Sequence, residues 1–265
     1  MSDAVPIRDP ADSRLDEFRN LSHADRRPDR PGGRGLVIAE GVVVVRRLVA
    51  SRYPLRALLG VARRHIELAD DLAGTAAPFY VATAEVMAEV VGFHLNRGVL
   101  ATADRVGFPP AADLLDAVRT VAVLEGVGDH ENLGALFRNA AAFGVGAILL
   151  ADGCADPLYR RSVRVSMGTV LGVPFAMLPG WPHGAMNLLR DKGFRTAALT
   201  PSGEMTLREA GLAGRVAFLL GSEGPGLTPA ALRSADVRAR IPMAGGVDSL
   251  NVATAAAVAF AALPD

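Results

Sequence analysis

Polar side chains that could bind or activate a ligand gather in three short segments of the second half of the chain. The last segment, residues 241–251, places Ser249 and Asn251 behind a glycine-rich bend and directly ahead of the apolar run 252–263. Such a run is typical of a core helix, whose first turn has unpaired N–H groups and a positive dipole end that favour a polar ligand. Taken alone, the segment has a simpler interpretation, in which Asp248 or Ser249 is the N-cap of that helix.

The first of the three segments, residues 128–140, follows an apolar stretch that predicts a strand. Asn132 lies where a helix would begin, so capping is its simplest role. Arg138 lies six positions further on in a nearly all-apolar stretch. That stretch predicts a buried helix, and an unpaired buried arginine is costly. Both residues would lie near the carboxyl end of a strand, where open α/β sheets bind their ligands.

The middle segment, residues 218–228, predicts a strand, a glycine-rich loop and a helix, with Glu223 inside the loop. The loop lacks the lysine and hydroxyl of a phosphate-binding P-loop and the glycine spacing of a dinucleotide-binding fingerprint. Ser222 also lacks the G-x-S-x-G frame of a nucleophile elbow. Two interpretations remain: a loop whose backbone can approach a ligand closely, or an ordinary connection from strand to helix.

The second half of the chain predicts an alternation of strands and helices that would position these segments. Strands are expected at residues 121–124, 147–150, 175–178, 195–199, 216–220 and 237–241, and helices at 133–143, 157–165, 183–191, 229–235 and 250–262. Several of the strands are apolar throughout, which predicts a mostly parallel sheet buried on both faces. Three strand ends would then carry the polar segments.

The first half predicts a smaller α/β domain over residues 34–106. We expect strands at residues 35–45, 55–59, 79–82 and 98–103, and helices at 46–51, 66–72 and 83–91, the last capped by Thr83. Residues 1–33 are polar and predict an irregular or partly helical lead. Residues 107–116, around Phe108-Pro109-Pro110, predict a linker to a second domain at 117–265.

Composition limits the classes of function. Cys154 is the only cysteine and the five histidines are scattered, so we expect no disulfide framework and no metal site. The first residues are charged, and no apolar stretch approaches the roughly 20 residues of a membrane span. These features predict a cytoplasmic protein that does not enter a membrane.

The charge distribution is uneven, although the formal net charge is zero. Residues 1–66 hold thirteen arginines against eight acidic residues, and Lys192 is the only lysine. Arginine suits bidentate phosphate contacts, so the first part of the chain could face RNA. A general preference for arginine in the source genome would explain the same bias.

Together the three segments contain N-x-G-x-x-x-R-x-A at 132–140, L-G-S-E-G-x-G at 220–226, and I-P-M-x-G with S-L-N at 241–251. In this order and spacing they resemble the SpoU/TrmH family of RNA ribose methyltransferases in the SPOUT superfamily. The resemblance covers most of residues 117–265. The first half resembles, at the level of fold only, the small ribosomal-protein-like RNA-binding domain that many members carry.

The resemblance implies an α/β domain with a trefoil knot, S-adenosylmethionine bound in the knot, and an active site at a homodimer interface. The cofactor pocket it implies is lined by Gly221, Ile241 and Leu250, with Thr200 and Met243 nearby. The catalytic positions it implies are Asn132, Arg138, Glu223, Ser249 and Asn251, and a further segment near the substrate contains Arg164 and Ser166.

Arg138 corresponds to the arginine proposed to activate the ribose hydroxyl. Because arginine rarely gives up its proton, we expect it to stabilise the developing alkoxide, with an RNA phosphate accepting the proton. Ala253 stands where many members carry serine, and Asp129-His130-Glu131 is an unusually charged lead into the first motif.

The expected activity is therefore methyl transfer to a ribose 2′-OH, with ribosomal RNA favoured over transfer RNA as the substrate. Two alternatives are an RNA-binding protein of the same fold that no longer methylates, and a nucleotide-cofactor enzyme of the Rossmann type. The intact motif residues weigh against the first alternative, and the missing fingerprint weighs against the second.

Overall fold

The computed structural model describes residues 4–21, 35–245 and 247–263. The chain folds as two compact units. The N-terminal unit comprises Met1–Val106 and Leu158–Gly172, and the C-terminal unit comprises Gly107–Pro157 and Val173–Asp265. No helix in the described residues is long and apolar enough to cross a membrane.

The C-terminal unit is built on a seven-stranded sheet in which every neighbouring pair of strands is parallel. Its spatial order is β10-β12-β9-β11-β6-β7-β8. The strands are β6 (Thr120–Glu125), β7 (Ala147–Leu150), β8 (Phe175–Met177), β9 (Arg195–Leu199), β10 (Met205–Thr206), β11 (Val216–Gly221) and β12 (Val237–Arg240). The predicted α/β fold with a mostly parallel sheet is thus confirmed, and the carboxyl ends of β6, β11 and β12 share one edge.

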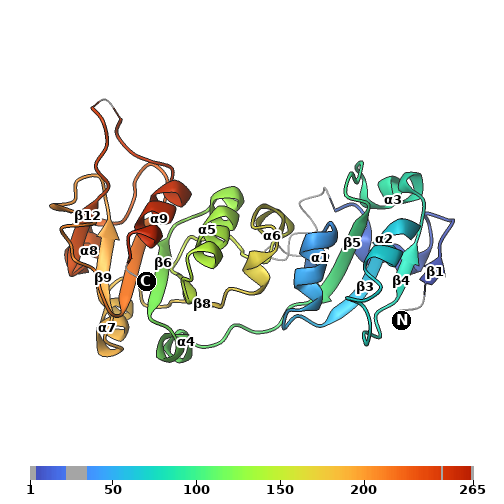
Figure 1. Ribbon diagram of the computed structural model, residues 1–265, viewed down its shortest axis with the longest axis horizontal. Coiled ribbons are helices and arrows are strands. Elements are labelled where there is room, and N and C mark those ends of the chain that lie inside the picture. Colours follow the sequence, from blue (N-terminus) through green and yellow to red (C-terminus); the bar gives the residue numbers. More distant parts are fainter. Residues whose placement is uncertain (1–3, 22–34, 246, 264–265) are drawn as a thin grey trace. The chain divides into compact units, whose positions relative to one another are not determined.

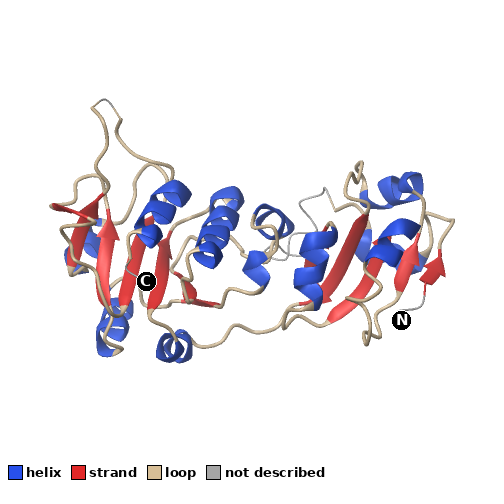
Figure 2. Cartoon of the chain, in the orientation of Figure 1, coloured by secondary structure: helices blue, strands red, loops and turns tan. Residues whose placement is uncertain are grey.

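Helices cover both faces of this sheet (Figures 1 and 2). They are α4 (Ala111–Ala117), α5 (His130–Ala142), α7 (His183–Asp191), α8 (Pro229–Ser234) and α9 (Val252–Ala261). Helices α4, α7 and α8 pack on one face, where they bury Leu115, Leu189 and Ala231. On the other face, Phe260 of α9 contacts Phe218 of β11, with ring centroids 5.7 Å apart. Residues 111–116 of the expected linker belong to α4 instead, because Ala111 and Leu115 are buried in this core.

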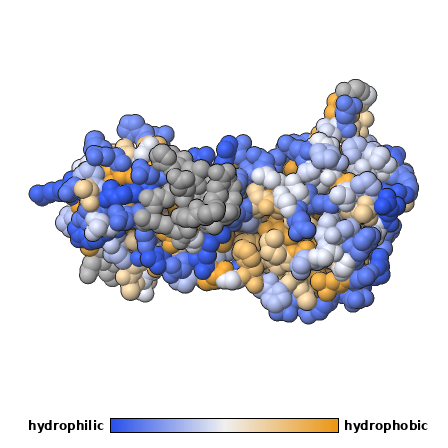
Figure 3. Space-filling view, turned by 180° about the vertical axis from the view of Figure 1, so that it is seen from behind, coloured by the Kyte–Doolittle hydropathy of each residue, from blue (hydrophilic) through white to orange (hydrophobic). Residues whose placement is uncertain are grey.

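The segment between β12 and α9 projects from the C-terminal unit (Figures 1 and 3). It contains the exposed side chain of Val247. Because this segment belongs to the last of the three motifs, one of the predicted site segments lies on a projecting loop. The knotted path implied by the resemblance stays a prediction.

The N-terminal unit has a five-stranded sheet of order β1-β4-β3-β5-β2, in which β5 is antiparallel to both of its neighbours. Its strands are β1 (Ala4–Pro6), β2 (Leu36–Glu40), β3 (Leu55–Gly60), β4 (Phe79–Val81) and β5 (Val99–Asp104). Its helices include the 3-10 helix η1 (Ser13–Phe18), α1 (Val42–Val49), α2 (Ala62–Glu67) and α3 (Ala84–Val91). One face of the sheet is covered by η1 and α3, which bury Phe18, Met87 and Val90.

Three expectations for this unit were wrong. The helix expected at residues 66–72 is α2, which begins four residues earlier and ends at Glu67. Residues 42–45 are helical rather than extended, because Gly41 ends β2 with φ of 88° and the following turns bury Val44, Val45 and Leu48 on one helical face. The lead is also more ordered than expected, since β1 adds an edge strand parallel to β4 and Phe18 is fully buried. Residues 22–33 of the predicted lead lie outside the described residues.

The segment Leu158–Gly172 folds with the N-terminal unit, although we placed it in the second domain. It contains α6 (Arg160–Val165) and the 3-10 helix η3 (Thr169–Leu171). Arg160 forms an ion pair of 3.1 Å with Glu40 at the end of β2, and Val163 is fully buried. These long-range contacts explain why the segment folds with the N-terminal unit. A prediction from local propensity does not detect them.

Candidate active site

Asn251 joins the three polar segments. Its Oδ1 accepts hydrogen bonds from the backbone N–H groups of Ala253 (3.0 Å) and Thr254 (3.3 Å), which makes it the N-cap of α9. Its Nδ2 donates to Oδ1 of Asn132 at 2.7 Å and to Oε1 of Glu223 at 2.8 Å. The convergence expected from the sequence is therefore observed for these three residues, and one amide links all three segments.

The helix caps differ from those expected. Asp129, not Asn132, caps α5, because its Oδ1 accepts from the backbone N–H of Glu131 and of Asn132, each at 2.9 Å. In the last segment, Asn251 caps α9 in place of Asp248 or Ser249. The side chain of Asn132 is consequently available to the site instead of to its own helix.

The loop after β11 is folded tightly back on itself. A Cβ atom on Gly221 would lie 2.2 Å from the carbonyl carbon of Gly226, so only glycine fits at this position. Ser222 and Gly226 form an antiparallel bridge, and the N–H of Gly226 donates to the carbonyl of Ser222 at 3.1 Å. The close approach holds Glu223 at the turn, where it meets Asn251.

Glu125 holds the far end of the same loop and was missed by the sequence analysis. Its Oε2 accepts from the backbone N–H of Thr228 at 2.8 Å, and its Oε1 accepts from Nε1 of Trp181 at 2.6 Å. Thr228 is the N-cap of α8, so the buried carboxylate ties the end of β6 to the start of that helix. The signal in the sequence was an acidic residue ending an otherwise apolar strand.

A cavity of about 630 Å³ lies beside these loops. This volume is within the range of small-molecule sites. All five residues expected at a cofactor pocket line it: Thr200, Gly221, Ile241, Met243 and Leu250. Glu223, Ser249 and Asn251 line it as well, so the loops after β9, β11 and β12 share the cavity at one edge of the sheet. Its wall combines apolar side chains, hydroxyl groups and the glycine-rich backbone of residues 221–226.

Arg138 is exposed, so the prediction that it is buried was wrong. Among the described residues it has no ion pair or side-chain hydrogen bond, and it does not line the cavity. The reason is that α5 packs against the sheet and α9 on one side only, which leaves Arg138, Ala141, Ala142 and Phe143 facing outward. Apolar residues therefore lie on the exposed face of this helix as well as on its buried face.

Arg164 and Ser166 lie in the N-terminal unit. Ser166 is fully buried, its Oγ donates to the carbonyl of Val163 at 3.0 Å, and it accepts from the N–H of Gly168 at 3.2 Å. The hydroxyl stabilises the turn after α6 and is not exposed to a substrate. Arg164 is exposed on the same helix.

No group of three or more potential metal ligands occurs among the described residues. Cys154 does not line the cavity, and its Sγ donates to the carbonyl of Leu124 in β6 at 3.2 Å. Burial raises the pKa of the Cys154 thiol, which favours the neutral form.

Residues 119–261 match the model of the SpoU rRNA Methylase family. The chain belongs to this family. A tRNA/rRNA methyltransferase of Mycobacterium tuberculosis, itself uncharacterized, is 58% identical over 262 residues, covering 97% of this chain and 91% of that protein. The 23S rRNA (guanosine-2′-O-)-methyltransferase RlmB of Vibrio cholerae is 34% identical over 136 residues, covering 51% of this chain and 55% of the relative.

Solved structures of methyltransferases share the fold over nearly the whole chain. The AdoMet-bound rRNA methyltransferase from Sinorhizobium meliloti superimposes with a TM-score of 0.82 at 23% identity, covering 98% of this chain and 97% of that one. The SpoU methyltransferase AviRb from Streptomyces viridochromogenes gives a TM-score of 0.78 at 22% identity, covering 95% and 96%. The likeness therefore extends over both units.

We expect the substitution Asn251→Asp to preserve the cap of α9 and to break the link between the segments. The new carboxylate can still accept from the N–H groups of the first turn, but it cannot donate to Asn132 and it repels Glu223. That repulsion raises the pKa of the carboxyl pair in the folded protein, so the variant loses stability as the pH rises through that pKa. Urea unfolding at pH 5 and pH 7 measures the effect. A variant with the pH dependence of the wild type would contradict the arrangement.

We expect Glu125→Ala to release the end of the glycine-rich loop. Loss of a hydrogen bond to a buried carboxylate costs about 1.5–3 kcal/mol, which corresponds to roughly 10- to 150-fold faster opening. Amide hydrogen exchange at residues 222–228 reports this directly, with Asp191→Ala, an exposed acid of the same unit, as the control. Equal exchange in the two variants would show that Glu125 does not hold the loop.

Proposed function

We propose that the protein transfers a methyl group from S-adenosylmethionine to a ribose 2′-OH of RNA, with ribosomal RNA favoured over transfer RNA. The hydrogen-bonded cluster of Asn132, Glu223 and Asn251, of which the last two line the cavity, carries this proposal. Its members belong to three different motifs of the family. Membership of the SpoU family and the 2′-O-methyltransferase activity named for the Vibrio relative support the same reaction.

The cavity suits S-adenosylmethionine in size and chemistry. Apolar side chains of Leu220, Ile241 and Leu250 offer a surface for an adenine ring, and the close backbone of the glycine-rich loop offers N–H and carbonyl groups. Hydroxyl groups of Thr200 and Ser249 stand at the same wall and suit the polar parts of the cofactor. When bound, the cofactor supplies an electrophilic methyl group on a sulfonium.

The polar cluster orients the reactants. Asn251 holds the Glu223 carboxylate and the Asn132 amide in fixed positions, so each can bind the substrate without reorganising. The bound cofactor would supply the methyl group that the ribose oxygen takes up, and the 2′-OH proton would pass to an RNA phosphate oxygen. Arg138 stabilises the alkoxide that develops on the ribose, since its guanidinium stays protonated.

The exposure of Arg138 is consistent with an active site completed by a second copy of the chain. Helix α9 is apolar all round, and α5 lies beside it, joined by a 2.7 Å hydrogen bond from Nδ2 of Asn139 to the carbonyl of Ala253. Phe143 and Val258 of these two elements remain 46% and 41% exposed. A helix that is apolar all round normally has each face covered. We therefore propose a homodimer formed across α5 and α9.

The N-terminal unit is proposed to bind RNA and the C-terminal unit to carry out the transfer, with both acting in the cytoplasm on RNA. The assay that tests the activity uses the full chain with radiolabelled S-adenosylmethionine and two substrates, unmodified ribosomal RNA and bulk transfer RNA. Label recovered in alkali-resistant 2′-O-methyl dinucleotides from one pool supports the reaction and identifies the RNA class. Cofactor binding without label in either pool favours the RNA-binding protein that does not methylate.

We expect Arg138→Ala to lower kcat by at least about 100-fold and to leave cofactor affinity unchanged, because the loss falls on charge stabilisation in the transition state. Arg138→Lys should recover part of the activity, since lysine restores the positive charge but lacks the planar guanidinium with its several N–H donors. Single-turnover methylation and calorimetric cofactor binding give the two values. Arg233→Ala, an exposed arginine of α8, is the matched control. Unchanged turnover in Arg138→Ala would remove the residue from the mechanism.

We expect Val258→Asp to convert the dimer to a monomer, because a carboxylate cannot be buried unpaired in an apolar interface. Sedimentation velocity measures the oligomeric state. Ile66→Asp is the control, since Ile66 is 75% exposed on the N-terminal unit and lies outside the proposed face. A Val258→Asp dimer as stable as the wild type would show that this face is not the interface.

A further inference from the structure

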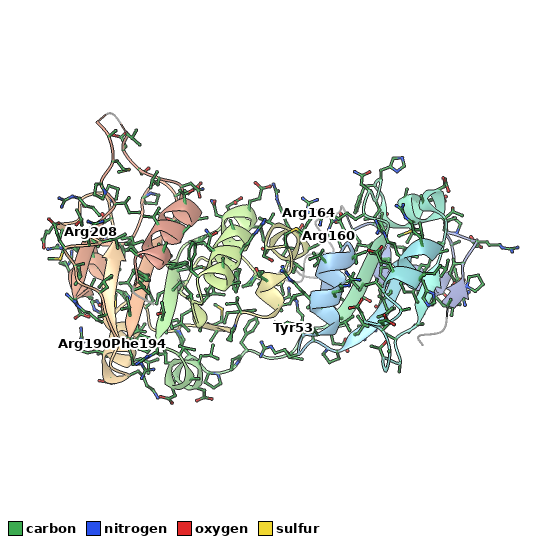
Figure 4. All side chains as sticks on the ribbon, viewed as in Figure 1. Tyr53, Arg160, Arg164, Arg190, Phe194 and Arg208 are labelled. Carbon is green, nitrogen blue, oxygen red and sulfur yellow. The ribbon has the colours of Figure 1, made fainter. Side chains whose placement is uncertain are left out.

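Arginines gather on the N-terminal unit where α6 packs against β2 and where η3 contacts α1. Arg160 and Arg164 lie one helical turn apart on α6 (Figure 4). From α1, Arg47 extends to the turn that follows α6, and its Nη1 donates to the carbonyl of Met167 at 2.7 Å. The cluster thus combines residues more than a hundred positions apart in the chain.

The centre of this cluster is the ion pair between Arg160 and Glu40. Nη1 of Arg160 lies 3.1 Å from Oε2 of Glu40, with only 19% and 9% of the two side chains exposed. The guanidinium also lies over the ring of Phe93, 4.7 Å from its centroid. Burial lowers the pKa of Arg160, and the Glu40 charge opposes that shift. Since the Glu40 carboxylate is paired with Arg160, it does not neutralise the charge of the other arginines of the cluster.

Three guanidinium groups on α1, on α6 and in the loop before β5 have no carboxylate partner within the described residues. Arg164 is exposed on α6, and Arg47 is exposed with only a carbonyl as its acceptor. Arg97, in the loop before β5, lies against Gly41: a Cβ there would lie 2.7 Å from Cδ of Arg97. Gly41 directly follows Glu40, so Arg97 contacts the backbone at the end of β2, the strand that carries the ion pair.

The chemistry of this surface favours a polyanion contacted along its backbone. Guanidinium groups match phosphate oxygens in a bidentate manner, and uncompensated positive charge attracts nucleic acid. Recognition of unpaired bases relies on exposed aromatic rings. The ring of Phe93 is covered by Arg160, so it does not offer its face to a base. Contacts here would set the position of the RNA without reading its sequence.

We propose that Arg47, Arg97 and Arg164 form one surface that binds the phosphate backbone of the substrate RNA, and that the Glu40–Arg160 pair holds α6 where it completes this surface. The proposal rests on the proposed function, because the RNA is the methylation substrate. It assigns RNA contacts to both sequence segments of the N-terminal unit. Glu40 and Arg160 act as positioning residues, whereas the other three contact the RNA.

The first test measures binding of the full chain to unmodified 23S ribosomal RNA transcripts by filter binding over a range of salt concentrations. Arg97→Ala and Arg164→Ala should each weaken binding about tenfold at low salt. Each should also reduce the slope of log affinity against log salt by about 0.7–0.9. Arg52→Ala is the matched control, because Arg52 is exposed on the same unit but lies over the ring of Tyr53, 5.3 Å from its centroid.

The second test separates positioning from simple electrostatics. Glu40→Gln removes a negative charge beside the surface, so electrostatics alone predicts tighter RNA binding. Loss of the anchor for α6 predicts weaker binding instead, and that is the result we expect. Cofactor binding reports only on the C-terminal unit, so far-UV circular dichroism and a thermal unfolding curve of the full chain, both equal to those of the wild type, show that the N-terminal unit of the variant is folded.

The surface is wrong if Arg97→Ala and Arg164→Ala bind RNA as tightly as Arg52→Ala does, while the wild type methylates RNA. The anchor is wrong if Glu40→Gln binds RNA more tightly than the wild type. A wild-type chain that binds neither ribosomal nor transfer RNA would overturn this surface together with the proposed function. A chain that binds RNA through these arginines without methylating it would leave the surface intact and reject the activity.

Discussion

The side-chain amide of Asn251 uses its full hydrogen-bonding capacity, and the geometry of the site depends on this. An amide offers two acceptor positions on oxygen and two N–H donors. The oxygen accepts from the first turn of α9, and the nitrogen donates to Asn132 and Glu223. Aspartate lacks the donors, serine has one, and glutamine is longer by a methylene. The start of a core helix and the position of two polar side chains are therefore set by the same group.

The parallel sheet makes that meeting possible. Because all neighbouring strands of the C-terminal unit run the same way, the ends of β6 and β11 lie side by side, and Glu125 pairs in register with Gly221. Glu125 then holds the start of α8, and Gly221 allows the next loop to fold back on itself. Local backbone constraints at two neighbouring strand ends thereby shape a wall of the cavity. The helices on the two faces supply the packing that keeps these strand ends fixed.

Hydrophobic periodicity predicted most elements of the C-terminal unit, since its buried strands and helices carry strong patterns. It failed where composition is ambiguous: residues 42–45 are β-branched but bury one helical face, and α4 is short and follows two prolines. The convergence of Asn132, Glu223 and Asn251 followed from parallel topology, because their segments all start at strand ends. The exposure of Arg138 could not be predicted, since an apolar helix face looks the same whether it meets a core or a partner. The roles of Glu125 and Glu40 depend on contacts with residues 56 to 120 positions away, which local patterns do not encode.

The chain passes between its two units three times, because the segment Leu158–Gly172 returns to the N-terminal unit. This has a consequence for folding during synthesis. Glu40 and Arg160 are separated by 120 positions. At roughly 5–20 residues per second, Arg160 is added about 6–24 s after Glu40. Throughout that interval the carboxylate of Glu40 lacks its partner, so the N-terminal unit cannot reach its final packing while the ribosome is still making the first third of the C-terminal unit. Its folding is therefore completed late, although it comes first in the sequence.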